Sequence, residues 1–347
     1  MSVSPSADTR APWKRFVVAT TTMLVLLTSG CTAADDNSTP GDSSTPSGPY
    51  PITVENFDGG VTIDKAPERI VVLEQDQAIE VIDLLGYSDH VIAYAQPEAV
   101  VDRPYLPAEF LRGGEKFNDG LIPANPGTIS PEAVAALDPD LIIGPDYLDE
   151  SDIEKLNATA PLVTTASGND DDQEIVENTF LALGKTKKDA AAFHDAAVDI
   201  LHNYGESTFG STKLVLDYFR ADEEDLGSPN FGSKIYFETG LERGPLTAKV
   251  KSTGESQTLS WENFGDLAQA DIFLIASIVP DETRAVLEAD PRWADLPAVK
   301  NDLVFYQGDP ELETSTSNPL TPLGAQHFVD TFGAQLAERL HAAGLVD

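Results

Sequence analysis

Cysteine and basic residues are both scarce in this sequence of 347 residues. A single cysteine, Cys31, rules out a disulfide within the chain, so packing must hold the fold together. Only 22 Lys and Arg stand against 58 Asp and Glu, which gives a formal net charge of −36 at pH 7. A field of that sign repels phosphate groups and anionic lipids, so we expect no nucleic-acid partner and no membrane contact through basic patches.

Sequence motifs of common catalytic and metal centres are absent too. The chain has no G-x-S-x-G, G-x-x-x-x-G-K-[ST] or H-E-x-x-H segment. None of its five histidines pairs with a nearby carboxylate at ligand spacing in a loop where a binding site is expected. We therefore expect neither an enzyme, a resident cofactor nor a protein-bound metal, with an unfamiliar secreted hydrolase as the minor alternative. Tandem repeats and basic wall-binding stretches, expected of an adhesive surface protein, are lacking.

The amino-terminal segment has the pattern of an export signal, residues 1–30. A basic flank precedes the apolar run Phe16 to Leu27, which is shorter than the roughly 20 residues that span a bilayer, and small residues follow. TSGC at 28–31 resembles a bacterial lipobox, although Thr28 stands where that motif has leucine. We expect Cys31 to carry lipid. The alternative is a plain secretory signal followed by a free cysteine.

A polar stretch, TAADDNSTPGDSSTPSGPY, follows this cysteine. It offers almost no large apolar side chain to a core, so residues 31–50 are expected to be a flexible tether. The sequence thus predicts a domain anchored by lipid to the outer face of the cell membrane.

Beyond the tether, short apolar runs alternate with stretches of helical period, which is typical of parallel sheets covered by helices. Helices are predicted at 78–86, from Pro131 behind the cap Ser130, and at about 323–343. Strands are predicted at 69–73, 90–95, 141–143, 161–165, 213–219, 234–237, 271–279 and 302–307. A helical stretch at 185–205 separates the two sets, long enough to be about 30 Å.

The second set of elements repeats part of the first. Five positions of the first set, including Ser130, Glu132 and Asp140, recur about 130 residues later, including Ser260, Glu262 and Asp271. Because S-x-E before an apolar run is also ordinary helix-start chemistry, the repeat alone leaves both readings open. Its matching position in both sets favours two lobes of one plan.

The order and spacing of these segments resemble the iron-siderophore substrate-binding proteins of bacterial ABC importers. The similar segments cover nearly all of residues 51–347; they are 67–86, 130–144, 160–165, 183–185, 261–275 and 290–307. The resemblance implies an α/β fold of two Rossmann-like lobes, 51–184 and 206–347, each a mainly parallel sheet flanked by helices. One long rigid helix, 185–205, would join them, and a monomer would hold the ligand between its lobes.

The resemblance also implies partners. A ferric siderophore is the expected ligand, with iron present only as part of that complex, and an ABC permease dimer is the expected recipient. Glu132 and Glu262 match the family's acidic residues that contact the permease. The alternative is that both carboxylates merely stabilise the starts of their helices.

Ligand residues are expected in loops beyond the carboxyl ends of the strands. Arg donors and aromatic walls suit the oxygens and apolar edges of a ferric siderophore. The candidates in those loops are Tyr94, Arg103, Arg112, Phe117, Tyr147, Arg220, Tyr236 and Arg284. Each tyrosine could instead serve packing, and Arg220 could neutralise the acids at 222–224. Haem, with Tyr147 or Tyr236 as axial ligand, or a corrinoid is the alternative ligand, and the sequence leaves the siderophore class open.

Overall fold

In the computed structural model, Pro49–Asp347 forms one compact unit. The structure describes residues 49–56, 59–96, 105–123, 128–165, 172–221, 226–228, 234–253, 257–259, 261–276, 280–307 and 320–347. The expected signal segment, Cys31 and nearly all of the expected tether lie outside the described residues. No helix in the part that is described has both the length and the apolar character needed to span a bilayer.

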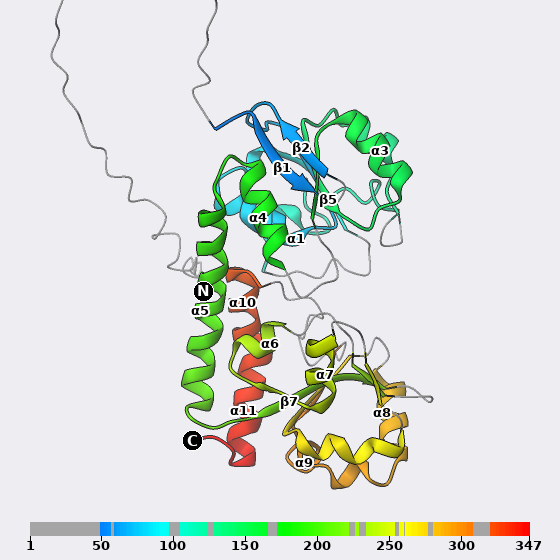
Figure 1. Cartoon of the computed structure of the whole chain (residues 1–347), viewed down its shortest axis with the longest axis vertical. Helices are drawn as coiled ribbons and strands as arrows, with labels where there is room; N and C mark the ends of the chain where they lie inside the picture. The colour runs from blue at the N-terminus through cyan, green and yellow to red at the C-terminus, as the bar shows by residue number, and fades with distance from the viewer. Residues whose placement is uncertain are drawn as a thin grey trace, which may run out of the picture. The chain divides into compact units, whose positions relative to one another are not determined.

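The first lobe is built on a four-stranded parallel sheet (Figure 1). Its strands run in the spatial order β4-β3-β5-β6, in which β3 lies between the next two strands of the chain. The bounds are β3 Ile70–Leu73, β4 Val91–Ala95, β5 Leu141–Pro145 and β6 Leu162–Thr165. An antiparallel hairpin of β1 (Ile52–Asn56) and β2 (Gly59–Ile63) precedes them. The sequence reading had missed this hairpin.

Helices cover this sheet because β3 and β5 are buried along their whole length and need apolar cover on both faces. One core packs side chains of α1, such as Ile79, against Val72, and the other packs Val134 of α2 and Leu156 of α3 against Val71. The helices are α1 Asp76–Leu84, η2 Ser88–His90, η4 Ala108–Phe110, α2 Pro131–Ala135, α3 Glu150–Thr159 and α4 Asp172–Ala182.

The second lobe repeats the strand order. Its parallel strands lie as β9-β7-β11-β12, so β7 again separates the next two parallel strands of its lobe. An antiparallel extension, β8 and then β10, pairs with the end of β7. The bounds are β7 Val215–Ala221, β8 Leu226–Ser228, β9 Glu242–Arg243, β10 Gln257–Leu259, β11 Ile272–Ile275 and β12 Val304–Tyr306.

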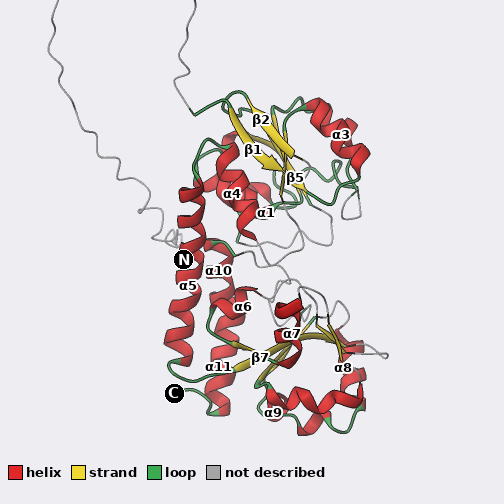
Figure 2. Ribbon diagram, viewed as in Figure 1, coloured by secondary structure: helices red, strands yellow, loops and turns green. Residues whose placement is uncertain are grey.

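Figure 2 shows the helices of this lobe around its strands. They are α6 Lys234–Glu238, α7 Pro245–Thr253, η5 Trp261–Gln269, α8 Pro280–Ala289, η6 Trp293–Asp295 and α9 Pro297–Lys300. The strand predicted at 234–237 is wrong, because these residues form the one-turn helix α6. Three consecutive side chains of α6, Ile235 to Phe237, are buried in the core, and a strand would have turned alternate ones outward.

The predicted joining helix is α5, Lys187–Phe209, which extends four residues beyond the expected end. Thr186 and Asp189 form a capping box at its start, each side chain accepting a backbone N–H of the other. Near the other end, a Cβ at Gly205 would overlap the carbonyl oxygen of Thr239, so glycine lets α5 approach the turn after α6. The mixed α/β fold, with a mainly parallel sheet flanked by helices in each lobe and this long helix, confirms the predicted fold class.

The terminal helix lies against α5. It consists of α10 (Pro322–Phe328), a π-helical turn η7 (Val329–Gly333) and α11 (Ala334–Ala343). The hydroxyl of Tyr204 on α5 donates to the carbonyl of Gly333 at 2.7 Å, which ties the π turn to the long helix.

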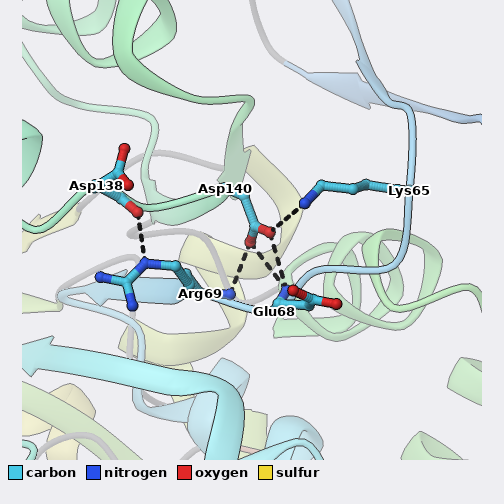
Figure 3. Close-up of polar contacts among 5 residues, drawn as sticks. All are labelled: Lys65, Glu68, Arg69, Asp138 and Asp140. Atoms are coloured by element: carbon cyan, nitrogen blue, oxygen red, sulfur yellow. Dashed lines mark hydrogen bonds and ion pairs between the residues drawn. The ribbon is translucent and has the colours of Figure 1, made fainter.

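An aspartate at the start of a central strand appears in both lobes. Asp140, just before β5, accepts backbone N–H groups of Glu68 and Arg69, and Lys65 lies 3.2 Å from its carboxylate (Figure 3). Asp271, just before β11, accepts the N–H of Val215 at the start of β7 at 2.9 Å. The repeat seen in the sequence at these two positions therefore corresponds to equivalent places in the two sheets.

Candidate ligand-binding site

The carboxyl ends of β3 and β5 are neighbours at the point where the strand order of the first lobe reverses. This is the place where open α/β sheets bind ligands. Glu74 follows β3 directly, and Tyr147 lies two residues beyond β5. The Tyr147 hydroxyl donates a hydrogen bond to the Glu74 carboxylate, so the two loops are linked at this edge. The sequence reading chose Tyr147 and missed Glu74.

Two properties distinguish this pair. Tyr147 is 48% exposed, although most large apolar side chains in the described residues are covered. Glu74 has a φ of 56°, in the left-handed region that favours glycine, and its N–H donates to the carbonyl of Ala95 at the end of β4. Only two residues, Glu74 and Gln75, separate the end of β3 from the start of α1.

Three other predicted residues lie at the edge strand β4, and Tyr94 belongs to the strand itself rather than to the loop after it. Tyr94 is only 1% exposed and packs edge-on against Phe110 and Phe117. Phe117 pairs with Tyr94 through an isolated β-bridge and is half-buried. The guanidinium of Arg112 lies 4.5 Å from the centre of the Phe117 ring and 3.3 Å from Asp119. The structure thus brings these three together, with Tyr94 inside the core and Arg112 exposed.

In the second lobe, Arg220 occupies the corresponding edge, near the end of β7. Its partner across the sheet is Gly227 of β8, where a Cβ would lie 2.8 Å from the Arg220 Nε. Glycine at this position leaves room for the guanidinium to lie across β8. Arg284 of α8 stacks on the ring of Tyr306 at 4.3 Å, close to the end of β12.

Tyr236 does not lie in a loop as expected. It belongs to α6, is 1% exposed, and its ring contacts Phe328 and Phe332 in the core. Burial raises the pKa of its hydroxyl to about 12, and Gln307 lies within 3.4 Å. Contact with a ligand or haem would require this packing to open, so the structure favours the packing alternative for Tyr236.

The remaining predicted positions are placed only in part. Glu132 is exposed in the first turn of α2, and Ser130 caps that helix by accepting the N–H of Ala133. Glu262 lies in η5, but its side chain is not among those described, and Arg103 and Cys31 lie outside the described residues altogether. Both glutamates thus stay predictions for permease contact.

Sequence reasoning missed a contact between the lobes at Glu80. This α1 side chain is 1% exposed, and its Oε1 accepts the backbone N–H of Leu323, in the first turn of α10, at 2.8 Å. Burial raises the pKa of Glu80 to about 8, against the lowering effect of hydrogen bonds from Thr321 and Leu323. The ring of Tyr105 in the first lobe also lies 5.1 Å from that of His327 in α10. In the sequence, the only sign of this contact was that Glu80 is a charged residue at a position where the helical pattern expects an apolar one.

Within the described ranges, no three His, Cys, Asp or Glu side chains gather as they would around a metal ion. What the described edges offer is an exposed aromatic ring beside a carboxylate in one lobe and arginines in the other.

The sequence profile described as periplasmic binding protein matches residues 123–310, more than half of the chain. The chain belongs to that family. This periplasmic binding protein is 28% identical over 318 residues to the iron(3+)-hydroxamate-binding protein FhuD of Bacillus subtilis (strain 168). The match covers 88% of the chain and 94% of the relative. The family consists of substrate-binding proteins, so the chain is not an enzyme.

Solved structures share the fold. PiaA of Streptococcus pneumoniae TIGR4 in complex with ferrichrome has a TM-score of 0.62 at 18% identity, covering 85% of this chain and 100% of that one. SirA of Staphylococcus aureus complexed with staphyloferrin B has a TM-score of 0.60 at 19% identity, covering 85% and 99%. At these identities the likeness of this periplasmic binding protein to both structures is one of fold.

Proposed function

We propose that this chain is an extracytoplasmic receptor that captures a ferric siderophore and delivers it to an ABC permease for iron uptake. The observation that carries the proposal is the match to an iron(3+)-hydroxamate-binding protein along nearly the whole of both chains. The carboxyl edges of the two sheets suit this role, because Tyr147 offers an apolar wall and Arg220 a donor for ligand oxygens.

A binding panel tests the ligand. The purified chain is titrated with ferric trihydroxamate, tricatecholate and carboxylate complexes, with haem and cobalamin alongside, and tryptophan fluorescence is followed. We expect saturable quenching by the ferric trihydroxamate, because of the relative's ligand, without consumption of the complex. A Soret shift with haem and no response to ferric siderophores would overturn the proposal in favour of a haem receptor.

Delivery to the permease depends, in this proposal, on Glu132 and Glu262. The double variant Glu132→Ala, Glu262→Ala should bind the ferric complex as the wild type does and lose import of ⁵⁵Fe. A matched control is Glu154→Ala with Glu282→Ala, which removes two exposed carboxylates from other helices. Import by the first pair equal to import by the control would contradict docking through these residues.

The membrane anchor is proposed on Cys31. Lipid on this residue, followed by the polar stretch to Tyr50, would keep a loaded monomeric receptor near its permease and raise the effective concentration for docking. Mass spectrometry of the mature amino terminus should find a diacylglyceryl cysteine. An unmodified terminus, or one that begins elsewhere, would leave a secreted receptor instead.

A further inference from the structure

The hydrogen-bonded pair Glu74 and Tyr147 does not take part in the apolar cores of the first lobe. Tyr147 is half exposed, and neither residue is among those that form the apolar cores of its lobe. Both stand at the carboxyl ends of the two central strands, β3 and β5. An aromatic ring kept out of the core at this edge is placed to meet a ligand.

The backbone conformation of Glu74 also supports a role in ligand binding. Left-handed residues other than glycine also occur at Asp138 and Asp302, but each of these lies at the end of a helix, where such a turn is common. Glu74 instead follows a strand, and glycine would adopt its φ of 56° without strain. Strained backbone that persists beside a binding edge is a signal of function, since glycine would serve the turn better.

The contact between the two side chains explains why a glutamate stands there. The Tyr147 hydroxyl donates to the Glu74 carboxylate, and a hydrogen bond to a charged acceptor is stronger than a neutral one. An exposed tyrosine otherwise changes rotamer freely. The bond fixes the ring at one end, while about half of the residue stays exposed.

We propose that Glu74 is a positioning residue that holds the Tyr147 ring as a wall of the ligand site, and that its charge selects uncharged or cationic ferric complexes. This rests on the proposed function. Three singly charged hydroxamates neutralise Fe³⁺, whereas three doubly charged catecholates leave the complex trianionic. Asp146, the residue before Tyr147, is partly exposed at the same edge, so a trianionic complex would approach a second carboxylate there.

Three variants separate position from charge. Glu74→Gly removes the carboxylate and relieves the backbone, Tyr147→Phe removes the donor, and Glu74→Gln keeps an acceptor without charge. We expect Glu74→Gly and Tyr147→Phe each to weaken binding of a ferric trihydroxamate about tenfold, and the double variant to be no worse, because both break one interaction. Glu74→Gln should stay within about threefold of the wild type and bind the tricatecholate complex more tightly than the wild type does.

Melting temperature and a control make the result specific. Glu74→Gly should not lower the Tm, since glycine suits the left-handed turn, so weaker binding cannot be attributed to unfolding. Glu150→Ala, an exposed carboxylate in the first turn of α3, should leave affinity unchanged. If the wild type binds the trihydroxamate and Glu74→Gly and Tyr147→Phe bind it equally well, the proposal is wrong.

A measurement without ligand keeps this inference separate from the proposed function. With fluorotyrosine at position 147, ¹⁹F NMR should show one resonance that shifts and narrows in Glu74→Gly and stays near the wild-type position in Glu74→Gln. An unchanged resonance in Glu74→Gly would refute the positioning role. A wild type that binds none of the panel would overturn the receptor proposal and the selectivity, while the resonance would still report whether Glu74 holds the ring.

Discussion

The two lobes have the same parallel strand order, β4-β3-β5-β6 and β9-β7-β11-β12, but differ in the residues at the carboxyl edge. At the amino edge, Asp140 and Asp271 make the same kind of bond to the neighbouring strand. At the carboxyl edge, the first lobe has Glu74 with Tyr147 and the second has Arg220 over Gly227. The shared edge maintains the sheet, and the edge that differs is where we propose that the ligand binds.

Buried acids show a second contrast. Asp217 of β7 bonds within its own lobe, accepting N–H groups of Leu246 and Thr247 at the start of α7, whereas Glu80 reaches from α1 of the first lobe to α10. Burial raises the pKa of both. Each acid has one oxygen without a hydrogen-bond partner in the described part of the chain, Oε2 of Glu80 and Oδ2 of Asp217, and the bonds to Glu80 come from Thr321 and Leu323 of the other lobe.

The largest expected effect comes from Glu80 and depends on pH. Its folded pKa of about 8 lies above that of an unfolded glutamate, so the folded state holds an extra proton and this stability is lost as pH rises from about 4.5 to 8. Glu80→Gln should remove about 1.4 kcal/mol per pH unit from the slope of unfolding free energy in that window. Urea unfolding at several pH values measures it. Equal slopes in the variant and the wild type would show that Glu80 ionises normally.

The next effect concerns how α5 is attached to the second lobe. Gly205→Ala should lower the unfolding free energy by about 3 kcal/mol, because the new Cβ overlaps the Thr239 carbonyl and α5 must move from α6. Gly265→Ala is the matched control, since an added Cβ there has no neighbour within 4 Å. Thermal unfolding of both variants tests this prediction. Similar Tm values would mean that α5 and α6 can move apart without loss of stability.

Asp140 and Asp271, at equivalent positions in the two sheets, should contribute unequally to the free energy of unfolding. Asp140 accepts two backbone N–H groups and pairs with Lys65, whereas Asp271 accepts the one N–H of Val215. Asp140→Ala should therefore cost about 2 kcal/mol and Asp271→Ala about 1 kcal/mol, since each leaves strand-start donors unpaired. Denaturant unfolding compares them directly. A larger loss for Asp271→Ala would contradict this ranking by the number of accepted N–H groups.

Much of this architecture could be predicted because the central strands have a recognisable sequence pattern. Runs such as Ile70–Leu73 and Ile272–Ile275 are apolar throughout, as strands buried on both faces must be, and Thr186 and Ser130 mark helix starts. The prediction was wrong for a short element. Residues 234–237 have strand-like composition, yet contacts with Phe328 and Phe332, distant in sequence, make them a helix.

The candidate site was predictable only in its location. Topology selects the loops beyond the carboxyl ends of strands; Tyr147 lies in such a loop, two residues beyond β5, whereas Arg220 lies within β7 itself. It cannot tell which aromatic ring stays outside: Tyr94 and Tyr236 went into the cores. Glu74 was missed because its role comes from a left-handed backbone and from a partner 73 residues away, neither of which leaves a pattern in the sequence.

The smallest expected change in stability lies at the edge of the second lobe, where Gly227 makes room for Arg220. Gly227→Ala should alter the unfolding free energy by less than about 1 kcal/mol, because Arg220 is exposed and its guanidinium can swing away. Ferric-complex affinity should fall all the same, roughly fivefold, since a displaced Arg220 no longer presents its donors in one geometry. Arg220→Lys, which keeps the charge and loses the planar fork, should weaken binding similarly. Gly227→Ala with unaltered affinity would mean that the second lobe contacts the ligand elsewhere, and the difference between the two carboxyl edges would then reduce to Glu74 and Tyr147.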